Sequence, residues 1–264
     1  MFYQLVESQV QIPSGKLQYV AFGKGEKNLI IIQGLNIRDL KGAGFSLALM
    51  YKMFAKTHRV YLFDRREVVQ EGLTNWDLAE DIYHDMQALG VTSADVFGVS
   101  QGGMIAMALA LEHPECVNKL VLGVTASRAN ENLRKIVGEW VDCARNRDYV
   151  TINQQTFSLM YTEEYLKKYQ LFMPLLVKMV KPKNFDRFAI LASAILNFDC
   201  YERLNELKCP VLVLGGEKDK ITTAAASLEI AQKLDCEIYM YSEYGHAAYE
   251  EAKDFNDRIY SFLA

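Results

Sequence analysis

The sequence predicts an α/β fold in which a mostly parallel sheet is interrupted by a helical insertion. Short apolar runs alternate with helical segments up to about residue 125, which is typical of parallel strands joined by crossover helices. Between residues 126 and 198 this alternation stops, and helical segments rich in Met, Phe and Tyr follow one another. The alternation then resumes. We therefore expect residues 1–125 and 199–264 to form one α/β core, and residues 126–198 to form a helical cap inserted into it.

Composition narrows the class of protein. The chain has 264 residues, of which 50% are hydrophobic and 23% charged, as in an ordinary globular protein with a large core. The net charge of −4 gives no basic excess for nucleic acid, and no apolar run reaches the roughly 18 residues of a membrane span. Five widely spaced cysteines and the absence of a signal peptide favour a cytoplasmic protein without zinc. The oligomeric state stays open.

The first elements can be placed by pattern. Pro13-Ser14-Gly15 joins two alternating stretches and indicates a hairpin. Thr74 and Asp77 have the spacing of a capping box and predict the start of a helix. That helix has an apolar stripe of Leu78, Ile82, Met86 and Leu89. The remaining early elements are expected, in order, as strands at 9–12, 16–22 and 28–32, a helix at 45–55, and a strand at 58–63.

Residues 94–112 have the pattern of a nucleophile elbow. An apolar strand leads into Gly98-Val99-Ser100-Gln101-Gly102, and a helix that is apolar on every side follows. So tight a turn strains the backbone of Ser100, and a side chain at Gly98 or Gly102 would collide with the neighbouring strand or helix. A glycine-rich turn without catalytic function is the alternative interpretation of this stretch.

The later elements complete the alternation. A strand is expected at 119–124, before the inserted helices. After them we expect a strand at 211–214, a helix at 223–234 and a strand at 237–241. Phe255, Ile259 and Phe262 have helical spacing and predict a final helix. Ligands bind at the carboxyl edge of such a sheet, which is where an inserted cap would lie.

A serine hydroxyl needs a base and a group that orients the base. His246 is the only histidine after the insertion, and it lies in a loop that follows a predicted strand. The strand at 211–214 ends in Gly215-Gly216-Glu217-Lys218-Asp219, and Asp219 is favoured as the acid because it lies deeper in the loop. Glu217 is the alternative acid. Ser100, Asp219 and His246 are thus the candidate catalytic residues.

The elbow, the segment 210–219 and Tyr244-Gly245-His246 together resemble the α/β-hydrolase superfamily, in its capped single-domain branch of esterases, peptidases and C–C hydrolases. The resemblance covers nearly the whole chain except the cap. It implies an eight-stranded sheet, a Ser-Asp-His triad, and no metal or organic cofactor. It also implies an oxyanion hole formed by two backbone N–H groups, which fall on Leu35 and Gln101 in this sequence.

Two segments depart from the usual pattern of that family. Gln33-Gly34 replaces a His-Gly pair, and Arg65-Arg66 replaces an Arg-Gly pair. The first change leaves the backbone donor but alters its side-chain support. The two arginines either bind a polar or anionic end of a substrate or, as the favoured interpretation, are solvated at the surface.

The functional hypothesis is a serine hydrolase that cleaves an ester or related acyl bond of a small, partly apolar molecule. Thioesterase, aminopeptidase, perhydrolase and C–C hydrolase activities use the same residues and are not separated by sequence. Aromatic cap residues either line the substrate pocket or form the core of the cap: Phe157, Tyr161, Phe172 and Phe188. A ligand-binding receptor or scaffold of the same fold with little turnover is the alternative from another functional class.

Overall fold

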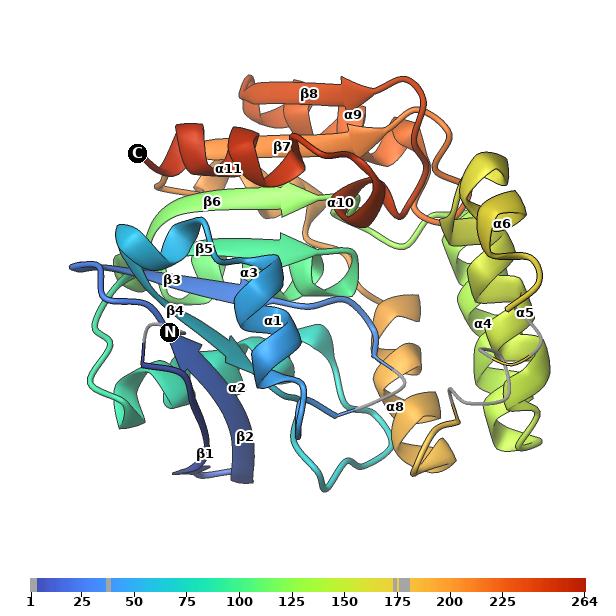
Figure 1. Cartoon of the computed structure of the whole chain (residues 1–264). Coiled ribbons are helices and arrows are strands. Elements are labelled where there is room, and N and C mark those ends of the chain that lie inside the picture. Colours follow the sequence, from blue (N-terminus) through green and yellow to red (C-terminus); the bar gives the residue numbers. More distant parts are fainter. Residues whose placement is uncertain (1–3, 37–38, 173–174, 176–180) are drawn as a thin grey trace.

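The strands form a single sheet in a computed structural model that describes residues 4–36, 39–172, 175 and 181–264. The sheet has eight strands in the order β1-β2-β4-β3-β5-β6-β7-β8 (Figure 1). The β1–β2 and β2–β4 pairs are antiparallel, and the other five pairs are parallel. The structure thus confirms the α/β fold predicted from the alternation of strands and helices.

The strands differ in burial according to their place in the sheet. Central strands β5 and β7 are buried at every residue, whereas β8 at one edge has exposed residues that alternate with less exposed ones. The β1–β2 hairpin matches the turn predicted at Pro13–Gly15. The bounds are β1 Val6–Ile12, β2 Gly15–Phe22, β3 Lys27–Ile32, β4 His58–Phe63, β5 Ala94–Val99, β6 Val117–Gly123, β7 Val211–Gly216 and β8 Glu237–Tyr241.

Helices cover both faces of the sheet and include the predicted capping box at Thr74. One expected helix differs: α1 ends at Met50, and a separate 3₁₀ turn at Phe54–Lys56 follows. Tyr51, Phe54 and Ala55 are buried and have helical spacing in the sequence, which explains why a longer helix was expected. The backbone after Met50 instead forms turns before β4 begins at His58. The helices are α1 Gly44–Met50, α2 Asn75–Ala88, α3 Gln101–Glu112, α4 Glu131–Arg145, α5 Tyr149–Met160, α6 Glu163–Tyr169, α8 Phe185–Leu196, α9 Ala224–Leu234, α10 Ala248–Glu251 and α11 Phe255–Leu263.

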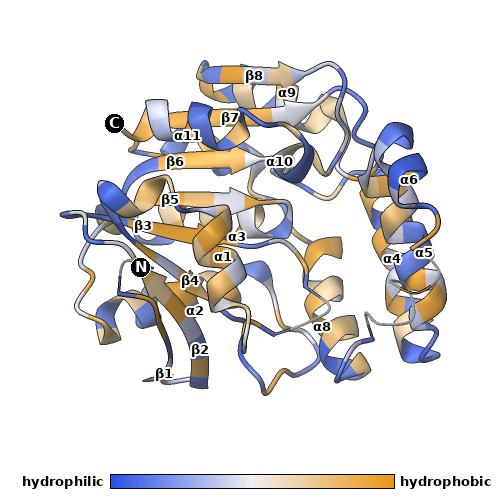
Figure 2. Ribbon diagram, viewed as in Figure 1, coloured by the Kyte–Doolittle hydropathy of each residue, from blue (hydrophilic) through white to orange (hydrophobic). Residues whose placement is uncertain are grey.

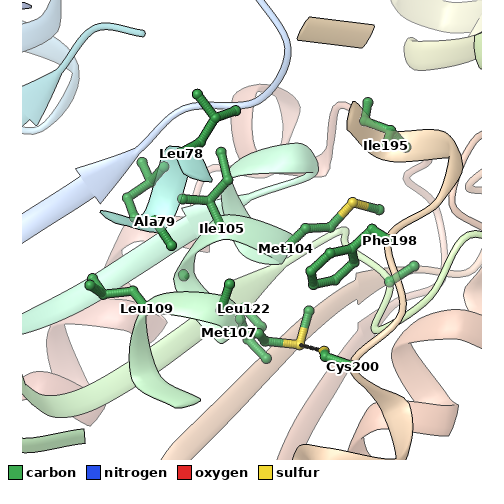
Figure 3. Packing of buried hydrophobic residues seen from close by; sticks show 14 of the residues in the cluster. Leu78, Ala79, Met104, Ile105, Met107, Leu109, Leu122, Ile195, Phe198 and Cys200 are labelled. Carbon is green, nitrogen blue, oxygen red and sulfur yellow. Dashed lines mark hydrogen bonds between the residues drawn. The ribbon is translucent and has the colours of Figure 1, made fainter. Parts of the chain in front are cut away.

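Two hydrophobic cores lie on opposite faces of the sheet. One is formed with α1, α10 and α11, and the other with α2, α3 and α9. Figure 3 shows the second core, where Met104 and Ile105 of α3 lie among side chains of neighbouring elements, including Leu78 of α2 and Phe198. Residues 101–111 of α3 are all buried. The helix that follows Ser100 is therefore packed on every side, which fixes the position of the serine.

The helices between β6 and β7 lie beyond the carboxyl ends of the central strands (Figure 1). Apolar side chains of α4 and α8 pack together and join the core around α3. Figure 2 shows the central strands as largely hydrophobic and α6 as largely hydrophilic. No helix among the described residues is long and apolar enough to span a membrane.

Candidate active site

The backbone of the elbow is strained at Ser100. Its φ of 54° and ψ of −122° lie in a region that residues with a side chain rarely adopt. A Cβ on Gly98 would lie 2.4 Å from the Gly102 carbonyl oxygen, and one on Gly102 would lie 2.0 Å from the Ile32 carbonyl oxygen. The glycines predicted on steric grounds are therefore required for strand, turn and helix to approach this closely.

Hydrogen bonds to neighbouring segments hold Ser100 in this conformation. Its amide donates to the Gly123 carbonyl at the end of β6, at 2.9 Å. Its own carbonyl accepts a hydrogen bond of 2.6 Å from the Thr125 hydroxyl. Bonds on both sides offset the cost of the unusual φ, and the hydroxyl is presented at the carboxyl edge of the sheet.

The structure brings together the three side chains that the sequence singles out. The Ser100 Oγ lies 2.9 Å from Nε2 of His246, and Nδ1 of His246 lies 2.9 Å from Oδ2 of Asp219. His246 is in the loop after β8, and Asp219 is in the loop after β7. Both side chains are buried, so the contacts between them are screened little by solvent.

Asp219 is held as an ionised carboxylate. Burial alone would raise its pKa, but the His246 ring and hydrogen bonds from Thr222 and Ile221 lower the pKa below the ordinary value. Oδ1 accepts from the amides of Ile221 and Thr222 at 2.8 and 3.1 Å, and the Thr222 hydroxyl donates to Oδ2 at 2.7 Å. Glu217, the alternative acid, is exposed. The geometry therefore favours Asp219.

The two predicted backbone donors lie beside the serine. Leu35 and Ser100 both line one cavity, and a Cβ on the intervening Gly34 would come within 3.3 Å of the Ser100 Cβ. Gln101 starts α3, so its N–H is one of the unpaired amides at the helix amino terminus. Neither N–H donates a hydrogen bond to another backbone group among the described residues. Both remain available to an anion.

Side-chain bonds of Gln101 connect the elbow to other helices. Its Nε2 donates to the Asn75 side chain at 3.1 Å and to the Leu191 carbonyl of α8 at 2.7 Å. The residue after the serine thus links α3 to α2 and to the inserted helices. Sequence reasoning missed this role, because it assigned only the backbone N–H of Gln101.

The arginine pair differs from the favoured expectation that both are solvated. Arg65 is buried, and burial lowers its pKa to about 10. Arg66 is partly buried and forms two hydrogen bonds with the Asp81 carboxylate. Arg187 of α8 donates to the backbone carbonyls of both arginines at 2.7 and 3.0 Å. The pair is consequently part of the contact between the core and the inserted helices.

A cavity of about 170 Å³ opens at the serine, with Ser100 and His246 in its wall. Apolar side chains from the inserted helices form much of it: Leu133, Val137, Trp140, Met160, Phe188 and Ile195. A second, more open cavity continues outward past Phe157 and Tyr161. Phe188, Phe157 and Tyr161 therefore line cavities, whereas Phe172 is exposed. The inner cavity is small beside the roughly 300–1,000 Å³ of typical ligand pockets.

Among the titratable residues in the wall of the inner cavity, Tyr51, Tyr249 and Glu250 were not singled out from the sequence. Tyr51 follows α1, and the other two lie on α10, just after His246. Glu250 lies on α10, four residues after His246 in the preceding loop. That spacing is the only signal in the sequence, and it is weak.

The chain is similar in sequence and in fold to several known hydrolases. The chain is 26% identical over 213 residues to the 2-hydroxy-6-oxo-6-phenylhexa-2,4-dienoate hydrolase of Comamonas testosteroni, covering 76% of this chain and 73% of that protein. It is 24% identical over 262 residues to a putative carbamate hydrolase of Rhizobium rhizogenes, covering 90% and 92%. The enol-lactonase of Burkholderia xenovorans LB400 shares the fold, with a TM-score of 0.85, 21% identity, and coverage of 97% of this chain and 99% of that one.

A family model described as the alpha/beta hydrolase fold matches residues 37–253. The match spans the elbow, the loop of Asp219 and the loop of His246. It also includes the inserted helices, but it begins after the turn of residues 33–36 that lines the cavity. The chain belongs to the α/β-hydrolase family and is an enzyme of that fold.

Proposed function

We propose that this chain is a serine hydrolase that cleaves an ester or related acyl bond of a small, partly apolar molecule. The contact of Ser100 with His246, and of His246 with Asp219, is the observation that carries the proposal. The order Ser, Asp, His along the chain matches the order of triad residues on this type of sheet.

In the proposed mechanism His246 acts as the general base. Its Nε2 takes the proton of the Ser100 hydroxyl as the oxygen attacks the carbonyl carbon, and it then passes this proton to the leaving group. Asp219 holds the ring with Nδ1 protonated and stabilises the imidazolium. A water molecule activated by the same nitrogen then hydrolyses the acyl-enzyme.

The amides of Leu35 and Gln101 are proposed to stabilise the tetrahedral oxyanion. Two observations support this: both residues lie next to Ser100, and their N–H groups lack backbone acceptors among the described residues. Each such donor lowers the barrier by about 3 kcal/mol in other enzymes.

The substrate class follows from the walls of the cavity. Its small volume and apolar wall favour a compact acyl group, held under the helices between β6 and β7. These helices are proposed to act as a cap, and the partner is proposed to be a small molecule in the cytoplasm. Relatives named for a dienoate and a carbamate support hydrolysis without fixing the bond.

Activity-based labelling tests the proposal. Wild type should react with a fluorophosphonate and hydrolyse short p-nitrophenyl esters, and Ser100→Ala should abolish both. The control is Ser158→Ala, which removes an exposed serine of α5 and should leave both unchanged. Labelling that persists in Ser100→Ala would refute the assignment of the nucleophile.

A panel of ester, thioester, amide and C–C substrates then identifies the bond. Tight binding of a ligand without turnover would instead favour a receptor of the same fold.

A further inference from the structure

A single carboxylate stands where the inner cavity meets the outer one. Glu250 lines both cavities, and so do Tyr249, Thr156 and Met160. The two spaces are therefore adjoining parts of one passage from Ser100 to the surface. The passage runs between the inserted helix α5 and the core elements α1 and α10.

Tyrosines surround this carboxylate. The Tyr161 hydroxyl donates to Oε2 of Glu250 at 2.7 Å. Burial and then the negative charge of Glu250 raise the pKa of Tyr51, Tyr161 and Tyr249, so the charge lies close to all three phenols. Tyr51 and Tyr249 are also in the wall of the inner cavity, alongside Ser100.

No basic side chain of the described residues neutralises Glu250. It forms no ion pair within the described part of the chain, and no described lysine or arginine lines either cavity. Asp39, the other carboxylate of the outer cavity, is paired with Lys183 at 2.8 Å. Among the described residues the passage therefore carries a negative charge with no cationic partner beside aromatic side chains, an environment that attracts cations and repels anions.

We infer that the passage beside Glu250, Tyr51 and Tyr249 recognises a cationic group, such as a quaternary ammonium, on the substrate. This inference rests on the proposed serine hydrolase function, because it describes the substrate of that same site. It also separates the chain from a relative named for a dioate, a substrate that carries two carboxylates. Glu250 is then a specificity-determining residue, and it takes no part in proton transfer.

Two pairs of isosteric esters test the inference. Butyrylcholine is compared with 3,3-dimethylbutyl butyrate, which places the cation on the alcohol side. The p-nitrophenyl esters of 4-(trimethylammonio)butyrate and 5,5-dimethylhexanoate place it on the acyl side. In each pair a quaternary nitrogen replaces a carbon of the same shape. Because the cation also makes the ester intrinsically more reactive, each ratio of kcat/KM is divided by the ratio of the two rates of alkaline hydrolysis.

In wild type we expect a cation-to-neutral ratio of about five to ten for at least one pair, which is the scale of a partly exposed charge contact. Added NaCl should reduce this ratio, since salt screens exposed charges. Glu250→Gln should bring the ratio close to one. The control is Glu251→Gln, which removes a charge from the next residue of α10, outside both cavities, and should leave the ratio as in wild type.

A ratio at or below one for both pairs in wild type would overturn the inference, and so would an equal effect of the two variants. Ser100-dependent hydrolysis of the neutral esters would in that case still support the proposed function. Failure of wild type to hydrolyse any of the four esters or to react with a fluorophosphonate would overturn the proposed function together with the inference.

Discussion

The guanidinium of Arg65 donates through Nη2 to the backbone carbonyl of Gln33 at 2.6 Å, and so holds the turn that carries Leu35. Arg65 is buried, and its pKa of about 10 keeps it cationic at neutral pH. The Gln33 side chain accepts a hydrogen bond of 2.7 Å from Asn36 within the same turn. In this chain, therefore, Arg65 and Asn36 hold the turn in which the family usually has a His-Gly pair.

Arg65→Met should therefore lower kcat more than it raises KM. Displacement of the turn would move the proposed oxyanion donor at Leu35, and errors of about 1 Å in such groups cost about a hundredfold. We expect kcat for a p-nitrophenyl ester to fall ten- to a hundredfold. Affinity for a boronic acid that forms a tetrahedral adduct with serine should weaken in parallel.

The matched control for Arg65 is Arg66→Gln. Arg66 bonds to Asp81 on α2, and its side chain makes no hydrogen bond to the Gln33 turn. We expect this variant to affect thermal stability more than kcat. A similar loss of kcat in both folded variants would contradict a positioning role for Arg65.

Asp219→Asn should lower kcat by about 10⁴ with ester substrates, because an amide would favour the wrong tautomer of His246. The Thr222 and Ile221 donors that lower the pKa of Asp219 would also lose their anionic acceptor. Glu217→Gln changes an exposed carboxylate two residues away and should leave kcat within about twofold of wild type. Equal losses in the two variants would reopen the choice between the two acids.

The residues predicted from the sequence are those whose position depends on the sheet alone. Ser100, Asp219 and His246 each follow a strand, and the carboxyl ends of parallel strands meet at one edge. Arg65 and Glu250 could not be predicted in the same way. Arg65 contacts Arg187, which lies more than 120 residues later in the chain. Glu250 accepts a hydrogen bond from Tyr161, which follows α5. Contacts between segments so far apart leave no pattern in the sequence.

Two glycine substitutions should have opposite effects on stability. Gly102→Ala places a Cβ 2.0 Å from the Ile32 carbonyl oxygen, a backbone atom that cannot move without displacing β3. We expect it to unfold the chain or prevent soluble expression. Gly138→Ala on α4 meets nothing within 4 Å and should raise the free energy of unfolding by about 0.5–1 kcal/mol. Urea denaturation measures both, and a soluble, stable Gly102→Ala variant would contradict the packing described at the elbow.

Asp85 of α2 makes stability depend on pH. It is fully buried, and neither carboxylate oxygen has a hydrogen-bond partner within the described residues. Burial, followed by the negative charge of Asp81 one turn earlier, raises its pKa to about 8. Asp81 itself bonds to Arg66 and Ser14, so these groups do not compensate Asp85 directly.

The sign of this dependence follows from the raised pKa. Between the unfolded pKa near 4 and the folded pKa near 8, the folded chain retains a proton that the unfolded chain has released. This group therefore lowers the free energy of unfolding by about 1.4 kcal/mol per pH unit across that range, with no further loss above pH 8. Asp85→Asn cannot titrate, and its stability relative to wild type should increase as the pH rises from 5 to 7.5.

Urea denaturation at several pH values checks the prediction, with Glu164→Gln as a control that removes an exposed carboxylate of α6. We expect the stability of the control to change with pH as that of wild type does, because the substitution leaves the buried Asp85 in place. Parallel profiles for Asp85→Asn and wild type would mean that Asp85 already loses its proton in the folded chain near pH 4. A buried cation or water would then have to stabilise the carboxylate, because burial without such a partner raises the pKa.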